Sequence, residues 1–103
     1  MSNVLIVTRH KTLVEWLNQN GIHGNVIEQA TPEDVEGKDV YGVLPMWLAA
    51  HANSVTEVSM PGLPLEDRKR VNGGDFTVED MEQWGAELKT FIVREAWTRD
   101  GEK

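Results

Sequence analysis

Short apolar runs alternate with amphipathic segments along this chain. Residues 3–8 (NVLIVT) are a β-branched apolar run bounded by polar residues, which predicts a central strand buried on both faces. In residues 12–20 (TLVEWLNQN) the apolar side chains recur at helical spacing, and Gly21 follows as a stop, so a helix is expected there. The chain is therefore expected to open with a buried strand and an amphipathic helix.

The alternation of strand and helix patterns continues through the middle of the chain. The further expected elements are a strand over residues 26–28, a helical turn opened by Thr31-Pro32-Glu33-Asp34, a buried strand over 39–44, a helix over 45–51, and a strand over 54–60 near an edge. Strands that alternate with helices are joined by right-handed crossovers into a mostly parallel sheet. We therefore predict one α/β domain over residues 1–103, a small Rossmann-like three-layer sandwich with a sheet of about four strands.

The pattern changes after residue 60. Residues 61–74 are rich in Gly, Pro and charge, which predicts a long loop that acts as a lid over a ligand. The capping pattern Thr77-Val78-Glu79-Asp80 opens a last helix, along which apolar residues form one stripe. The residues of the stripe are Met81, Trp84, Leu88, Phe91 and Ile92. Residues 100–103 are expected to form a frayed polar tail.

Composition limits the class of protein. A chain of 103 residues with 40% hydrophobic residues can bury one modest core. The absence of cysteine leaves neither disulfides nor thiolate metal sites and fits a reducing compartment. No apolar run approaches the roughly 20 residues that span a bilayer, and residues 1–3 lead into the first strand without a signal-peptide pattern. We therefore expect a cytoplasmic protein that does not enter a membrane.

Charge is distributed unevenly along the chain. The net charge of −7 argues against binding of bulk DNA or RNA, which requires a broad basic face. Five of the ten Lys and Arg residues nevertheless fall in two short segments, 9–11 and 68–70. Ligands of open α/β sheets bind beyond the carboxyl ends of the strands, and both segments are predicted to lie at that edge. An anion is therefore expected to be held locally there.

The strand-to-helix junction Thr8-Arg9-His10-Lys11 has the residues of a phosphate-binding loop. Backbone N–H groups and the helix dipole favour an anion at such a junction. Arg9 adds a planar fork that suits phosphate oxygens, Lys11 adds a point charge, and His10 can donate or accept a proton. We predict that Arg9 and His10 are catalytic and that Thr8 and Lys11 bind the ligand. The alternative is a solvated strand end at which His10 caps the helix.

Four further residues complete the candidate ligand-binding set. Pro45, Met46 and Trp47 begin a second strand-to-helix junction, whose N–H groups suit another phosphate and whose indole could stack on a base. The alternative is that Met46 and Trp47 face the core or an interface. Arg68 could close over an anion with the loop around it, unless that loop is simply solvated.

Metal and cofactor chemistry find little support in the sequence. The three histidines have no metal-ligand spacing, and Gly-rich phosphate loops of the Walker or dinucleotide type are absent, so neither a metal site nor a cofactor is expected. RNA-type phosphodiesters carry their own nucleophile, the adjacent 2′-OH. A small basic pocket would therefore need only to position the ligand and stabilise charge.

Three motifs stand out together: the strand ending in Thr8-Arg9-His10 with a following helix that carries Glu15-Trp16, the segment Gly42-Val43-Leu44-Pro45-Met46-Trp47-Leu48-Ala49-Ala50, and Thr77-Val78-Glu79-Asp80-Met81. In these motifs the chain resembles, over nearly its whole length, the small single-domain CRISPR-associated ring nucleases of type III systems. The resemblance implies a homodimer that binds cyclic tetra-adenylate at its interface and cuts it to linear products ending in 2′,3′-cyclic phosphate, which switches off antiviral effectors. It also implies roles for Arg9, His10 and the Pro45 turn, although the family often carries His where this chain has Trp47.

Two other functions fit the same residues. A strand ending in Arg-His also begins the histidine phosphatases, in which the His is phosphorylated, but Lys11 stands where those enzymes have Gly. A module that senses or sequesters a cyclic nucleotide without cutting it would have the same pocket.

A homodimer is expected on two grounds. The large apolar residues Met46, Trp47, Trp84 and Trp97 exceed what one small core needs. A cyclic tetranucleotide contains a two-fold axis, and an isologous interface can match that axis.

Overall fold

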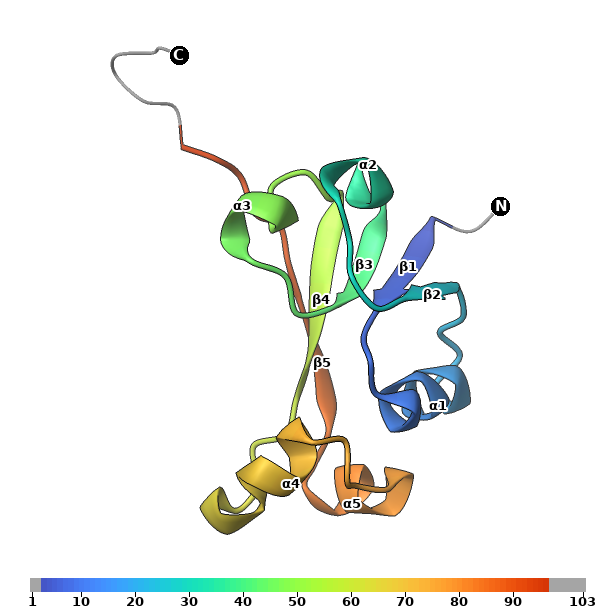
Figure 1. Ribbon diagram of the computed structural model, residues 1–103, viewed down its shortest axis with the longest axis vertical. Coiled ribbons are helices and arrows are strands. Elements are labelled where there is room, and N and C mark those ends of the chain that lie inside the picture. The colour runs from blue at the N-terminus through green and yellow to red at the C-terminus, as the bar shows by residue number, and fades with distance from the viewer. Residues whose placement is uncertain (1–2, 97–103) are drawn as a thin grey trace.

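The computed structural model describes residues 3–96 as a five-stranded sheet with helices packed on it (Figure 1). The strands are β1 (Val4–Val7), β2 (Asn25–Ile27), β3 (Asp39–Gly42), β4 (Ser54–Ser59) and β5 (Glu87–Phe91). The helices are α1 (Lys11–Gln19), α2 (Pro32–Val35), α3 (Met46–Ala49), the 3-10 turn η1 (Leu65–Asp67), α4 (Arg68–Asn72) and α5 (Val78–Gln83). The strand order is β2-β1-β3-β4-β5, with parallel pairing except between β4 and β5. The predicted α/β class with a mostly parallel sheet is confirmed.

Two apolar clusters fill the spaces on either side of the sheet. On one face, Leu5 and Val7 of β1 pack with side chains of α2 and α3. On the other face, Ile6 of β1 packs with Trp16 of α1 and Met81 of α5. Successive residues of a strand point to opposite faces, so β1 is buried on both, as its unbroken apolar run predicts. The helices and the sheet therefore form the layers of a Rossmann-like sandwich.

Side-chain caps fix where two of the helices begin. At α2 the Thr31 hydroxyl accepts the Asp34 N–H at 3.3 Å, and the Asp34 carboxylate accepts the Thr31 N–H at 2.9 Å. Thr77 and Asp80 form the same reciprocal pair at α5, with distances of 3.0 and 3.1 Å. Each pair satisfies two backbone donors that would otherwise lack a partner. Both capping patterns in the sequence therefore mark real helix starts.

The prediction of one helix through residues 77–92 is wrong in its second half. The helix α5 ends at Gln83, Gly85 adopts φ +75°, and residues 87–91 form β5, which pairs antiparallel with β4. Glycine accepts this backbone conformation without steric strain and so breaks the helix. The side chains of Leu88, Phe91 and Ile92 are 38%, 49% and 78% exposed, so they do not continue the buried stripe of Met81 and Trp84. The sheet consequently has five strands instead of the expected four.

Two other segments differ from the expectations. Residues 61–74, predicted to be a long irregular loop, contain η1 and α4, because residues 65–72 close successive short-range backbone hydrogen bonds. The helix expected over residues 45–51 is only the four-residue α3. The turn after it leads into β4, which reduces the length available to the helix.

Some expectations concern parts of the chain outside the described residues, namely the tail over residues 100–103 and the side chain of Trp97. Within residues 3–96 no helix has the length and apolar character that crossing a membrane requires.

Candidate functional site

The junction between β1 and α1 is a tight connection formed by Thr8, Arg9 and His10. The Thr8 hydroxyl accepts the His10 N–H at 3.1 Å, and the His10 carbonyl accepts the N–H groups of Leu13 at 3.1 Å and Val14 at 3.4 Å. His10 is thus the N-cap residue of α1 by its backbone, but its side chain makes no capping hydrogen bond. His10 therefore caps α1 as the alternative expected, but only through its backbone, and its imidazole takes no part in the cap.

A pocket of about 310 Å³ lies at the carboxyl ends of β1, β2, β3 and β4. Its lining includes Thr8, Arg9 and His10 from the junction and Glu28 from the end of β2. The lining is completed by Val7, Gly42 and Val58 of the strands, by Val43 just after β3 and by Leu13 of α1. A hydroxyl, a guanidinium and an imidazole on one concave surface can hold an anion and exchange a proton with it. Glu28 adds a carboxylate, which lowers the positive potential of the pocket.

Gly42 sets the close approach of β1 and β3 beside this pocket. It has φ +147°, and a Cβ at this position would overlap the backbone carbonyl oxygen of Val7. Val7 and Gly42 are paired residues in the register of these two strands. A side chain at position 42 would therefore push apart the two strand ends that border the pocket.

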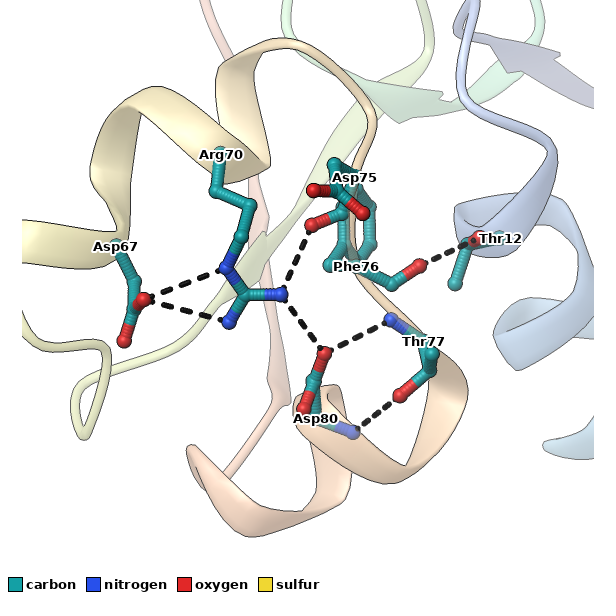
Figure 2. A network of polar contacts seen from close by, with 7 residues as sticks. All are labelled: Thr12, Asp67, Arg70, Asp75, Phe76, Thr77 and Asp80. Carbon is teal, nitrogen blue, oxygen red and sulfur yellow. Dashed lines mark hydrogen bonds and ion pairs between the residues drawn. The ribbon is translucent and has the colours of Figure 1, made fainter.

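Residues 74–76 pack against the side chain of His10. The Phe76 ring stands edge-on to the imidazole, with ring centroids 5.8 Å apart and planes inclined by 76°. The Thr12 hydroxyl donates to the Phe76 carbonyl at 3.0 Å (Figure 2). Gly74 lies so close that a Cβ there would be 3.1 Å from the His10 Nδ1. The imidazole is therefore packed against residues 74–76, which lie just before α5.

The other predicted ligand-binding residues lie outside this pocket. Lys11 lines a separate pocket of about 520 Å³ between α1 and β2. Met46 and Trp47 line one of about 350 Å³ against residues 93–96, and Pro45 is the N-cap of α3. Arg68 is exposed on α4. The structure therefore brings together Thr8, Arg9 and His10 and leaves the remaining five predicted residues at other places on the surface.

Arg70, one of the clustered cations, is held by acidic groups. Its guanidinium donates to the Asp67 carboxylate at 3.3 Å, to the Asp80 carboxylate at 3.4 Å and to the Asp75 carbonyl at 3.0 Å (Figure 2). The backbone N–H of Thr77 is the main cause that lowers the pKa of Asp80, and hydrogen bonding from Arg70 adds to it. Arg70 is thus a partner of these carboxylates and a poor candidate for binding an anionic ligand.

The remaining histidines lie away from the pocket. His51 faces Glu36, with 3.5 Å between its Nδ1 and the carboxylate. Glu36 comes just before β3, so this pair lies near the amino end of that strand, whereas the pocket lies at the carboxyl ends. His23 is an exposed residue of the turn after α1. Across residues 3–96, no three or more His, Asp or Glu side chains are grouped so that they could hold a metal ion.

Several residues in the pocket or packed against His10 were not among the candidates predicted from the sequence. Glu28 could have been, because it follows a predicted strand at the edge where ligands bind. Gly42 and Val58 carry no local signal, since their place depends on strand order and register. Gly74 and Phe76 reach His10 only through the packing of α5 against α1.

The geometry defines a class of protein, a small Rossmann-like domain with an anion-suited pocket at the carboxyl edge of its sheet. Residues 5–94 match the model of a family described as "Putative CRISPR-associated protein (Cas_VVA1548)". The chain therefore belongs to this CRISPR-associated family. Neither a curated protein nor a solved structure was found to match it.

Proposed function

We propose that this protein is a metal-independent ring nuclease that cleaves cyclic tetra-adenylate and so switches off type III CRISPR signalling. The observation that carries the proposal is the convergence of Thr8, Arg9 and His10 on one pocket in a chain of a CRISPR-associated family. These three side chains offer a hydroxyl, a bidentate cation and a proton carrier, which are suited to a phosphodiester.

The chemistry requires no group beyond the ligand and these residues. The ribose 2′-oxygen attacks the adjacent phosphorus, so a 2′-O–P bond forms while the P–O5′ bond breaks. The 2′-OH loses a proton and the departing O5′ gains one, which leaves a 2′,3′-cyclic phosphate and a 5′-OH. Arg9 stabilises the charge that develops on the phosphate oxygens, and His10 carries out one of the two proton transfers.

The size of the pocket favours a dimeric enzyme. Its volume of about 310 Å³ is at the lower end of ligand pockets, which span about 300–1,000 Å³, so it suits one nucleotide linkage and not a whole tetranucleotide ring. Two protomers around the two-fold axis of the ring would supply the remaining contacts. Met46 and Trp47 are 79% and 63% exposed and offer apolar surface to a partner, whereas Trp84 is buried in the core and contributes nothing to an interface.

Single-turnover cleavage of cyclic tetra-adenylate with enzyme in excess tests the proposal. The Arg9→Ala variant should bind the ring about 10- to 100-fold more weakly and also cleave it more slowly, because its contact serves both ligand and transition state. The His10→Ala variant should bind nearly normally and cleave about 10²- to 10⁴-fold more slowly. Lys89→Ala removes the same charge from β5, where Lys89 faces Glu87 at 3.7 Å, and serves as the control.

The products and the metal dependence decide between the alternatives. Linear products with 2′,3′-cyclic phosphate ends, formed equally well in excess EDTA, support the proposal. Tight binding without products would instead identify a sensor or sequestering module. Transfer of phosphate from a phosphomonoester to His10, with release of the alcohol, would identify a histidine phosphatase. Activity abolished by EDTA and restored by a divalent ion would refute the metal-independent route.

A further inference from the structure

The segment that packs on His10 is itself held from behind by Arg70. One guanidinium nitrogen donates to the Asp75 carbonyl at 3.0 Å, which lies inside that segment (Figure 2). The same guanidinium bonds the carboxylates of Asp67 before α4 and Asp80 in α5, and it lies 5.6 Å from the centre of the Trp84 ring. Arg70 therefore joins α4, the segment 74–76 and α5 at a single point.

The same segment meets the imidazole of His10 at two places. Gly74, with φ +83°, leaves room for the Nδ1 edge of the ring, and Phe76 stands against the ring at an edge. The Thr12 hydroxyl fixes the Phe76 carbonyl to the first turn of α1, the helix that His10 begins. Phe76 itself is 7% exposed and belongs to the core. The imidazole is thus confined by neighbours that cannot move independently of the core.

We propose that Arg70 and Gly74 are positioning residues for His10: Arg70 anchors the segment 74–76, and Gly74 lets that segment lie against the Nδ1 edge of the imidazole. This inference rests on the proposed function, in which His10 transfers a proton. With its Nδ1 edge packed against Gly74, the imidazole has Nε2 for the ligand. A proton carrier must lie within hydrogen-bond reach of its target, so confinement of the ring serves the reaction directly.

The hydrogen bonds of Arg70 favour a positioning role over a ligand-binding role. Two carboxylates and one carbonyl occupy its donors, so an anion would compete with fixed acceptors. The capping box of Thr77 and Asp80 belongs to the same network, because the Asp80 oxygen that accepts from Arg70 also accepts the Thr77 N–H at 3.1 Å. The start of α5 and the Arg70 contacts that hold residues 74–76 are therefore one hydrogen-bonded network.

A pair of glycine variants tests the contact. Gly74 and Gly21 both have φ +83°, but a Cβ at position 21 has no neighbour within 4 Å, whereas one at position 74 meets His10 Nδ1 at 3.1 Å. Gly74→Ala and Gly21→Ala therefore share the backbone strain, and only the first displaces the imidazole. Because a 1 Å misplacement can slow a reaction about 10²-fold, Gly74→Ala should cleave about 3- to 10-fold more slowly at saturating enzyme with near-normal affinity, and Gly21→Ala at the wild-type rate.

A second pair tests the anchor. Arg70→Met keeps the apolar stem and removes the donors, and Lys89→Met removes one exposed positive charge elsewhere. In NMR spectra of the uncomplexed protein, the His10 ring protons lie beside the Phe76 ring and are shifted by its ring current. Arg70→Met should move these His10 signals toward their positions in Phe76→Leu, whereas Lys89→Met should leave them in place.

Combination with His10→Ala separates positioning from a general loss of structure. If Arg70 and Gly74 act through His10, then His10→Ala/Gly74→Ala and His10→Ala/Arg70→Met cleave no more slowly than His10→Ala alone. Rate losses that multiply in the double variants would overturn the inference, as would unchanged His10 signals in Arg70→Met. Absence of cleavage by the wild-type protein would refute the proposed function, while normal wild-type cleavage with equal rates for Gly74→Ala and Gly21→Ala would refute only the positioning.

Discussion

Replacement of Gly42 by Ala should destabilise the protein more than the same replacement at another glycine with positive φ. At Gly42 the new methyl group meets the carbonyl oxygen of Val7, which is backbone and cannot turn away. A Cβ at Gly37, which has φ +71°, would have nothing within 4 Å, so Gly37→Ala shows the cost of a positive φ without a steric overlap. The extra loss of unfolding free energy in Gly42→Ala is expected to come mainly from the overlap between the new methyl group and β1.

The magnitude follows from two contributions. A non-glycine residue in a sparsely populated backbone region costs about 1–3 kcal/mol, which applies to both variants. Overpacking adds about 1–3 kcal/mol, which applies to Gly42→Ala alone. Gly37→Ala should therefore lose about 1–3 kcal/mol and Gly42→Ala about 2–6 kcal/mol. For a domain of this size each 1 kcal/mol lowers the melting temperature by about 4–8 °C.

Urea unfolding followed by tryptophan fluorescence measures both values, because Trp16 and Trp84 are buried at 4% and 7% exposure and become hydrated on unfolding. The dependence of the free energy on urea should stay the same in both variants, which confirms that only stability has changed. Equal stability of the two variants, within about 0.5 kcal/mol, would contradict the close strand approach inferred at Gly42.

Three other predictions concern the core, an acid-sensitive contact and the oligomeric state. Met81→Ala, at a fully buried position, should lose about 2–5 kcal/mol in urea unfolding, whereas Leu65→Ala, 76% exposed, should stay within about 0.5 kcal/mol. The folded state lowers the pKa of Asp80, so the ionised carboxylate stabilises the fold above the unfolded-state pKa, and this stabilisation is lost as the pH falls through the folded-state pKa. Asp80→Asn should therefore be less stable than wild type at neutral pH, and the difference in stability should disappear in acid. Light scattering at micromolar concentration should give a dimer mass for the wild type and a monomer mass for Trp47→Glu; a wild-type monomer would contradict the dimer.

The first half of the fold was predictable because its signals are local. Residues 3–8 form an unbroken apolar run, and Gly21 and the Thr31 cap mark helix ends through their own backbone chemistry. The strand β5 was missed because Leu88 and Phe91 stand at a spacing that also fits a helix. Pairing with β4, which spans five residue pairs and includes a 2.8 Å contact between the Thr56 and Thr90 hydroxyls, decides the outcome and has no signature in residues 87–91 alone.

The candidate site was predictable only where one junction supplies it. Thr8, Arg9 and His10 follow directly from the rule that ligands bind at the carboxyl ends of strands. The contributions of Val58 and Gly74 arise from strand order and from the packing of α5, which are tertiary properties. The segment predicted to be a lid-like loop is instead partly helical, over residues 65–72, and Arg70 bonds it to α5.

The contacts between α1 and residues 76–82 affect the order in which the fold forms during synthesis. Thr12 is bonded to the Phe76 carbonyl across 64 residues of sequence, and the Trp16 indole donates to Glu82 at 2.7 Å across 66. When a ribosome has released β1, α1 and β3, the apolar face that carries Ile6, Trp16 and Leu17 still lacks its cover. At about 5–20 residues per second, this face stays open for several seconds until α5 emerges. The packing of residues 74–76 against His10 is therefore expected to be among the last parts of the fold to form.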